Sequence, residues 1–238
     1  DEERSSRLRW VMHRLAESPE QWTGIANSIA QAADLGIVGL ELEEQEVPQE
    51  MLELLRRLPW SEDEEAEVPA EVLKELQRHL VLHHRGAGGE EYSLASSQQS
   101  QGTLTWLATV GPAIDALRLG QVLCIDELDA SLHPTLTATL VDMFKDPDLN
   151  TRGAQIVFTT HDTALLDNSP VQLLDAGEVW MTEKSSFGAS ELFSLADFPS
   201  NRKGTNKQRR YLAGAFGAIP QVDTSSLRRY LSDSAEAR

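Results

Sequence analysis

The stretch from Gln121 to Pro134 constrains the fold of this chain more than any other part of the sequence. It begins with four consecutive apolar residues, Val122 to Ile125, and two acidic residues, Asp126 and Glu127, follow directly. An uncharged apolar run of this length is typical of a central parallel strand that is covered on both faces. Ligands of open α/β sheets bind beyond the carboxyl ends of the strands, so the acidic pair is suited to hold Mg²⁺ or to position a water. The alternative is a strand that ends in a solvated acidic turn.

A second β-rich run, Ala154 to Thr160, also ends in polar residues, His161 and Asp162. Between the two runs, Thr135 to Phe144 has the apolar spacing of a helix. The three segments predict a βαβ unit, whose strands are parallel and have both carboxyl ends at one edge. We therefore expect His161 near the acidic pair, where an imidazole is a better candidate for a site residue than an isolated histidine.

These segments together resemble the head of an ABC-type ATPase. Residues 122–127 are similar to its Walker B strand, residues 128–134 to its D-loop and residues 158–162 to its H-loop. Upstream, residues 99–103 lead into the helical run 104–117, where the family has its signature loop and signature helix.

The residues of these motifs are similar to those of a bacterial branch of ATP-binding proteins related to RecF, SMC and OLD heads. In that branch the D-loop region ends in Leu-His-Pro and the tail ends in a Gly-Ala-Ile-Pro box, which here is residues 211–220. The resemblance extends from about Leu82 to Val222. One position departs from the branch, because Gln99 stands where a glutamate is usual.

The resemblance implies an α/β fold, in which a mainly parallel sheet is flanked by helices and joined by an N-terminal helical lobe. It also implies a dimer that sandwiches ATP and Mg²⁺. Asp126 would hold the Mg²⁺ shell, Glu127 would polarise the attacking water and His161 would contact the γ-phosphate. Such phosphoryl transfer proceeds by positioning and charge neutralisation. In this family, nucleotide switches commonly serve DNA maintenance or defence against phage.

The resemblance further implies that Ser100, Gly102 and Asp129 act on the nucleotide that the other subunit holds. From the residues alone, two of them have a simpler interpretation. Ser100 is suited to cap a helix N-terminus, and Asp129 is suited to be an ordinary acidic residue of a first helical turn. The complete set of motifs, in the family's order, favours the nucleotide role.

No Gly-x-x-x-x-Gly-Lys-Ser/Thr loop occurs in the 238 residues. That loop cradles phosphates and supplies a phosphate-binding lysine, so the chain alone is predicted to hydrolyse ATP negligibly. We expect the C-terminal portion of a head whose first lobe is missing here, and a first residue that is Asp1 agrees with a fragment or a processed piece. The other interpretations are a companion polypeptide that carries the loop and a degenerate head that no longer binds nucleotide.

The sequence predicts two parts along the chain. Residues 1–80 are interpreted as an insertion or helical lobe, in which a strand at 37–43 interrupts helical patterns. Residues 81–238 are interpreted as the C-terminal part of the ATPase head, with its remaining strands at 171–174 and 179–184.

Charge limits the partners of this chain. A net charge of −17 argues against a surface that binds nucleic acid in general. One basic cluster lies within this acidic chain, and its members are Arg202, Lys203, Lys207, Arg209 and Arg210. It is interpreted either as a contact for DNA, RNA or an acidic defence partner, or as a solvated face. The other expected partner is a second copy of the chain or a lobe that supplies the phosphate loop.

The single cysteine, Cys124, is expected to be a small apolar filler of the buried strand and cannot form an intrachain disulfide. A reducing cytosol is the compartment that such cysteine usage favours. The sequence has no signal peptide and no apolar run near the length that spans a bilayer, so we expect no membrane partner.

Two other functions remain open from the sequence. Asp126, Glu127, Asp129 and His161 could form a metal-dependent hydrolase or nuclease. An OLD-like nuclease requires a further catalytic domain, for which the residues after His161 are too few. The second alternative is a non-catalytic interaction module that keeps the shape of the head and has lost its nucleotide.

Overall fold

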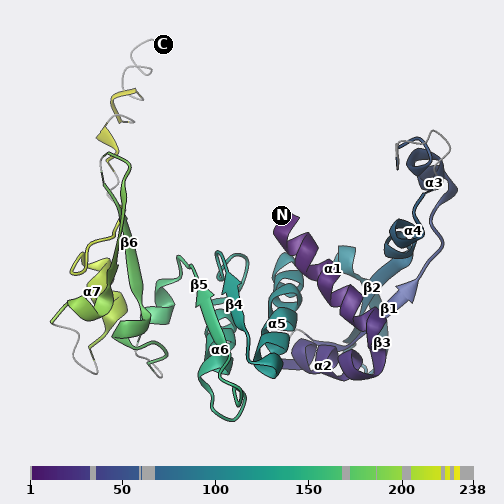
Figure 1. Ribbon diagram of the computed structural model, residues 1–238, viewed down its shortest axis with the longest axis horizontal. Helices are drawn as coiled ribbons and strands as arrows, with labels where there is room; N and C mark the ends of the chain where they lie inside the picture. The colour runs from purple at the N-terminus through teal and green to yellow at the C-terminus, as the bar shows by residue number, and fades with distance from the viewer. Residues whose placement is uncertain are drawn as a thin grey trace. The chain divides into compact units, whose positions relative to one another are not determined.

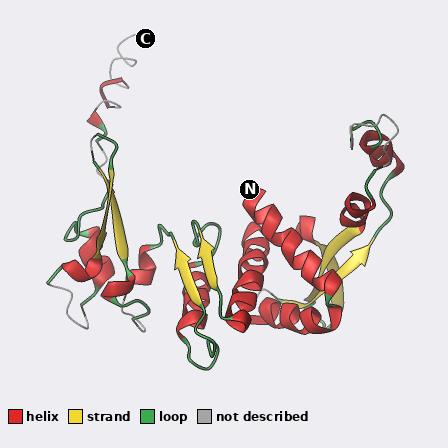
Figure 2. Ribbon diagram, viewed as in Figure 1, coloured by secondary structure: helices red, strands yellow, loops and turns green. Residues whose placement is uncertain are grey.

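The computed structural model describes residues 2–32, 36–58, 60, 68–167, 172–185, 187–199, 205–220, 223–225 and 228–230 of the chain. The chain forms two compact units, Asp1–His161 and Asp162–Arg238, which we call unit 1 and unit 2. Figure 1 labels their helices and strands, and Figure 2 colours them by type. The structure is mixed α/β, as predicted. Its division follows His161, whereas the sequence predicts a boundary after residue 80.

Unit 1 contains helices, a three-stranded sheet and a pair of parallel strands. In chain order its elements are α1 (Glu2–Glu17), α2 (Pro19–Ala32), β1 (Ile37–Glu44), α3 (Gln49–Leu55), α4 (Ala70–Gln77), β2 (Arg78–Arg85), β3 (Glu91–Ala95), the 3-10 turn η1 (Ser96–Gln98), α5 (Gln101–Leu119), β4 (Val122–Ile125), α6 (Pro134–Lys145) and β5 (Gln155–Phe158). The strand β3 is an addition that the sequence analysis does not predict, and it forms by antiparallel pairing with β2.

The region interpreted as a helical lobe is a layer of helices on an antiparallel sheet. The sheet has the order β1-β2-β3, and Leu40 of β1 lies opposite Leu82 of β2, both of them buried. Helix α2 contacts β1, and the side-chain oxygen of its Asn27 accepts from the Leu40 N–H at 2.8 Å. Trp22 of α2 is buried and makes an edge contact with Trp10 of α1. The predicted boundary at residue 80 therefore falls inside the middle strand of a sheet.

Helix α5 is the central helix of unit 1. Its sequence is apolar on nearly all sides, which is typical of a helix that is buried all round. Trp106 is 1% exposed, and its indole N–H donates to the Ile29 carbonyl at 2.9 Å. Near the end of the helix, the Asp115 carboxylate accepts from the Arg14 guanidinium of α1 at 2.7 Å. The helix is thus held by both α1 and α2, and it extends from the predicted signature loop to Gly120.

Helices α1 and α5 lie side by side (Figure 1). At Gly111 of α5, a Cβ atom would lie 3.0 Å from Val11 and 3.2 Å from Trp10 of α1. We expect Gly111→Leu to lower the free energy of unfolding by about 1–3 kcal/mol, because the added carbons displace two packed side chains. Gly24→Leu in α2 is the matched control, since a Cβ atom there has nothing within 4 Å. Urea denaturation followed by circular dichroism compares the two variants, and equal stabilities would contradict this packing.

The strands β4 and β5 pair in parallel, with Val122 opposite Gln155, and α6 connects them. This confirms the predicted βαβ unit. Coverage on both faces is not found, because only one face of the pair is buried. Ile125 is 7% exposed, whereas Val122 and Val157 are each 58% exposed.

Cys124 lies on the open face of the strand pair and is exposed, so its prediction as a buried filler is wrong. Successive residues of a strand point to opposite faces, and Cys124 therefore shares its face with Val122. Helices α5 and α6 contact the two strands, and the covered face is the one that Leu123 and Ile125 share. The apolar run correctly indicates a strand, but it does not reveal how many layers cover it.

Unit 2 is organised around a hairpin. Its elements are η2 (Thr163–Leu166), η3 (Ala176–Glu178), β6 (Trp180–Lys184), β7 (Ser190–Ser194), η4 (Leu195–Asp197) and α7 (Lys207–Leu212). The strands β6 and β7 are antiparallel, and a small core of Val179, Met181, Leu195 and Phe216 lies beside them. Residues 172–174 are not in a strand, contrary to prediction, and β7 is not predicted. Among the helices that the structure describes, none combines the length and the apolarity that crossing a bilayer requires.

Two members of the basic cluster have contacts inside unit 2. Lys207 is 4% exposed, and its Nζ donates to the Leu174 carbonyl at 2.8 Å. The Arg210 guanidinium carbon lies 5.1 Å from the centroid of the Phe216 ring, a cation–π contact. Arg209 is exposed, and the other two members, at 202 and 203, lie outside the described residues. Contact of this cluster with DNA or an acidic protein stays a prediction.

Candidate functional site

The candidate site lies at the carboxyl ends of β4 and β5, within unit 1. The Thr159 hydroxyl donates to Asp126 Oδ1 and accepts from the backbone N–H of Glu127 at 2.8 Å. Two backbone bonds continue the pairing beyond the strands, from Thr159 N–H to the Ile125 carbonyl at 3.1 Å and from Leu128 N–H to the Thr159 carbonyl at 2.9 Å. The acidic pair is therefore fastened to the end of the neighbouring strand.

Asp129 makes a second link between the same two segments. Its Oδ1 accepts from the Thr160 hydroxyl at 2.6 Å and from the His161 backbone N–H at 3.1 Å. Asp129 is half-buried, whereas Asp126, Glu127 and His161 are exposed. Within its own chain, Asp129 thus holds the backbone that carries His161, and the exposed groups remain accessible to a ligand.

Two residues of the loop after β4 have backbone angles in the left-handed region. The φ angle is 50° at Glu127 and 62° at Ser131. A non-glycine residue in this region costs about 1–3 kcal/mol and persists where neighbouring contacts hold it, often at functional sites. At Glu127 the holding contact is the bond from its N–H to Thr159. The loop is therefore held in one conformation that a free chain would seldom adopt.

The predicted signature loop lies beside this loop. Ser100 caps α5, since its Oγ accepts from the Thr103 N–H at 3.1 Å, which confirms the capping interpretation. A Cβ atom at Gly102 would lie 3.2 Å from the Ser131 carbonyl oxygen. Glycine is therefore the residue that allows the start of α5 to approach the loop that carries Asp129.

The predicted signature loop, residues 99–103, has a contact that sequence reasoning missed. Gln99 Nε2 lies 3.1 Å from His84 Nε2 on β2, and the His84 ring stacks on Tyr92 with centroids 5.8 Å apart. Gln99 is the position that departs from the related branch. Its amide pairs with an imidazole directly before Ser100, so the antiparallel sheet positions the start of α5. His83 points to the other face and pairs with Ser93 and Glu41, as adjacent strand residues must.

The structure brings Asp126, Glu127, Asp129 and the backbone of His161 together, and it brings Gly102 to the same loop. Sequence reasoning missed Thr159 and Thr160, the two hydroxyl residues that join the strand ends. The available signal was their position, because two hydroxyl side chains stand directly before His161 at the end of a strand. Hydrogen bonds between segments thirty residues apart are not visible in any local pattern.

The side chains of the site suit Mg²⁺ better than they suit a metal ion whose ligands all come from the protein. Among the residues that the structure describes, no three His, Cys, Asp or Glu side chains are grouped to hold a metal ion. Mg²⁺ needs fewer protein ligands, because it keeps several waters and takes one or two carboxylates together with substrate phosphates. The exposed carboxylate of Asp126, with Glu127 beside it, meets that requirement.

A parallel βαβ unit with acidic residues at its carboxyl edge is an arrangement in which open α/β proteins bind ligands. Residues 17–167, well over half of the chain, match the model of a family described as AAA domain, putative AbiEii toxin, Type IV TA system, and the chain belongs to that family. No curated protein and no solved structure matches the chain. The family confirms the predicted AAA or ABC-type ATPase-like domain, and domains of this kind generally bind ATP with Mg²⁺.

Proposed function

We propose that this chain is the signature-bearing part of an ABC-type ATPase head of the RecF, SMC and OLD kind, which works as an ATP-switched dimer. The observation that carries the proposal is the linked pair of strand ends, in which Thr159 fastens Asp126 and Glu127 while Asp129 fastens His161. This arrangement offers an exposed acidic pair at the edge where α/β proteins bind nucleotides.

Each side chain has a distinct role in the proposed hydrolysis. Glu127 orients and polarises the water that attacks the γ-phosphate, and His161 contacts that phosphate. Asp126 would hold Mg²⁺, which when bound neutralises charge on the phosphates. Thr159 is a positioning residue, because it holds the Asp126 carboxylate and the Glu127 backbone at once. The reaction proceeds by positioning and charge neutralisation, without a covalent intermediate.

The second copy completes each nucleotide site. Ser100 and Gly102, at the start of α5, and Asp129, in the loop after β4, act on the nucleotide that the other copy holds. The close approach of Gly102 to Ser131 supports this role, because it makes the signature loop and the D-loop one continuous surface. Such a surface can close on a phosphate as a unit, and hydrolysis then drives the opening of the dimer.

The phosphate-binding loop comes from a further lobe, on the same polypeptide or on a partner. Parallel sheets are usually covered on both faces, and the face of Val122, Cys124 and Val157 is open. That face is therefore the surface on which we expect the lobe to pack. We call this chain together with that lobe the complete head.

The cellular role of the complete head is proposed to be DNA maintenance or defence against phage, with Arg209 among the contacts to DNA or an acidic partner.

The test measures phosphate release from ATP by this chain and by the complete head. We expect no turnover by the chain alone and Mg²⁺-dependent turnover by the complete head, which Asp126→Ala reduces by about 10²-fold or more. Robust turnover by the chain alone would refute the need for a second lobe. Divalent-metal nuclease activity without ATP, lost in Asp126→Ala, would identify a nuclease, and failure of the complete head to bind ATP would identify a non-catalytic module.

A further inference from the structure

Unit 1 has a hollow at the opposite end of the parallel strands from the acidic pair. It has a volume of about 530 Å³, which lies within the usual range of roughly 300–1,000 Å³ for small-molecule sites. Its wall is formed by the last turns of α5 and α6 and by the loops that follow these helices. The residues that line it are Ile114, Leu117, Arg118, Leu119, Met143, Leu149, Thr151 and Arg152.

The loops around the hollow are fixed by contacts of their own. Asn150 donates from Nδ2 to the carbonyls of Phe144 and Ala154, both at 2.8 Å, and its Oδ1 accepts from the Ala154 N–H at 2.7 Å. Gly120 has a φ of 66°, and a Cβ atom there would lie 2.8 Å from the Arg152 carbonyl oxygen. The turn after α5 therefore packs directly on the loop that carries Arg152, and both loops at the rim of the hollow are held by contacts within unit 1.

The chemistry of the lining combines an apolar wall with positive charge. Leu119 and Leu149 are 55% and 53% exposed, so the wall presents apolar surface to solvent. Arg118 and Arg152 are exposed at the same hollow, on a chain whose net charge is −17. Asp115 pairs with Arg118 at 3.9 Å through one carboxylate oxygen and with Arg14 at 2.7 Å through the other, so the positive charge offered to a ligand is that of Arg152.

We propose that this hollow binds a small amphipathic anion, with its apolar body against Leu119 and Leu149 and its acid group paired with Arg152. The planar guanidinium group matches carboxylate, sulfonate and phosphate groups with two parallel hydrogen bonds. The hollow lies before the amino ends of β4 and β5, whereas the acidic pair follows the carboxyl end of β4. Its ligand is therefore a different molecule from the nucleotide, and the proposal does not depend on the proposed function.

The test is a fluorescence titration of the full 238-residue chain with anilinonaphthalene sulfonate, an apolar anion, and with phenylnaphthylamine, its neutral analogue. We expect saturable binding of the anion and weaker binding of the neutral probe. Arg152→Met should weaken anion binding roughly tenfold, through loss of a charge-assisted pair. Leu149→Glu should weaken it at least as much, because an exposed position gains a carboxylate that repels the probe.

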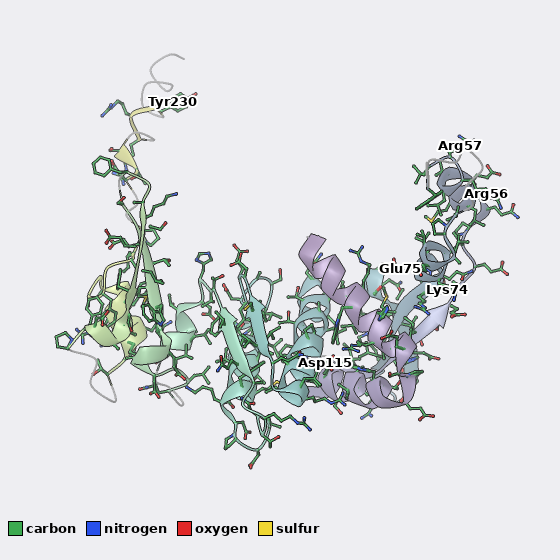
Figure 3. All side chains as sticks on the ribbon, in the orientation of Figure 1. Arg56, Arg57, Lys74, Glu75, Asp115 and Tyr230 are labelled. Atoms are coloured by element: carbon green, nitrogen blue, oxygen red, sulfur yellow. The ribbon has the colours of Figure 1, made fainter. Side chains whose placement is uncertain are left out.

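Two exposed positions on α3 and just after it provide matched controls, Arg57→Met and Leu54→Glu (Figure 3 labels Arg57). Neither residue lines the hollow, and both controls should bind the anion as the unmodified chain does. Thermal unfolding by circular dichroism checks that all four variants are folded. Unchanged anion binding in both hollow variants, equal losses in the controls, or equal affinity for the neutral probe would overturn the proposal.

Discussion

Glu127→Gln is expected to lower ATP hydrolysis by the complete head by about 10²–10³-fold, while ATP still binds. Glutamine keeps nearly the shape of glutamate but has no charge with which to polarise an attacking water. The backbone N–H of residue 127 still donates to Thr159, so the strand ends stay linked. Because ATP is held and not cleaved, the variant should accumulate as a closed dimer.

Phosphate release and analytical ultracentrifugation, with and without ATP and Mg²⁺, measure the two effects. Glu53→Gln, at an exposed position of α3, is the control for the charge change and should leave the rate of ATP hydrolysis and the dimer population unaltered. If Glu127→Gln were only monomeric with ATP, the proposed dimer geometry would be incorrect. If it hydrolysed ATP at the unmodified rate, another residue would have to position the water.

The part of the fold that the sequence predicts well is the part built from local signals. The βαβ unit is one example, because Val122 to Ile125 and the run before His161 are apolar and end in polar residues. The helix between them has Pro134 at its first position and an apolar face. Secondary-structure propensity and hydrophobic periodicity depend on a few neighbouring residues. Both patterns can therefore be recognised without knowledge of the rest of the chain.

The features that sequence reasoning missed depend on contacts between distant residues. Cys124 is exposed because none of the described elements covers its face of the strand pair, which no local pattern can indicate. Lys207 is buried because a carbonyl thirty-three residues away accepts from its ammonium group. The strands β3 and β7 are short, and each forms by pairing with a partner strand, β2 and β6 respectively.

In the candidate site too, local sequence reveals some residues and only tertiary contacts reveal the others. Asp126, Glu127 and His161 are recognisable because each follows the end of an apolar strand. The hydroxyl groups that join them, on Thr159 and Thr160, take part only once β4 and β5 have paired in register. Likewise, the pairing of Gln99 with His84 requires β2 to pass beside the signature loop. Sequence therefore indicates which residues can react, and tertiary contacts determine how they are held.

Equal mixing of Ser100→Asp and Asp126→Ala complete heads is expected to restore ATP hydrolysis that neither variant has alone. Aspartate caps a helix about as well as serine, so α5 should keep its start, while the added charge repels the γ-phosphate held by the other copy. In a mixed dimer, one nucleotide site receives both defects and the other receives none. Random exchange makes half of the dimers mixed, so activity should return to about a quarter of the unmodified rate.

The matched control mixes Asp126→Ala with Glu127→Gln, two variants that damage the same half of each site. Every dimer in that mixture has a defect in both sites, and no activity should return. Phosphate release is measured after the subunits have exchanged, with thermal unfolding as the check that Ser100→Asp is folded. If Ser100 acted within its own subunit, the first mixture would stay as inactive as the control, because Ser100 and Asp126 would then belong to one site.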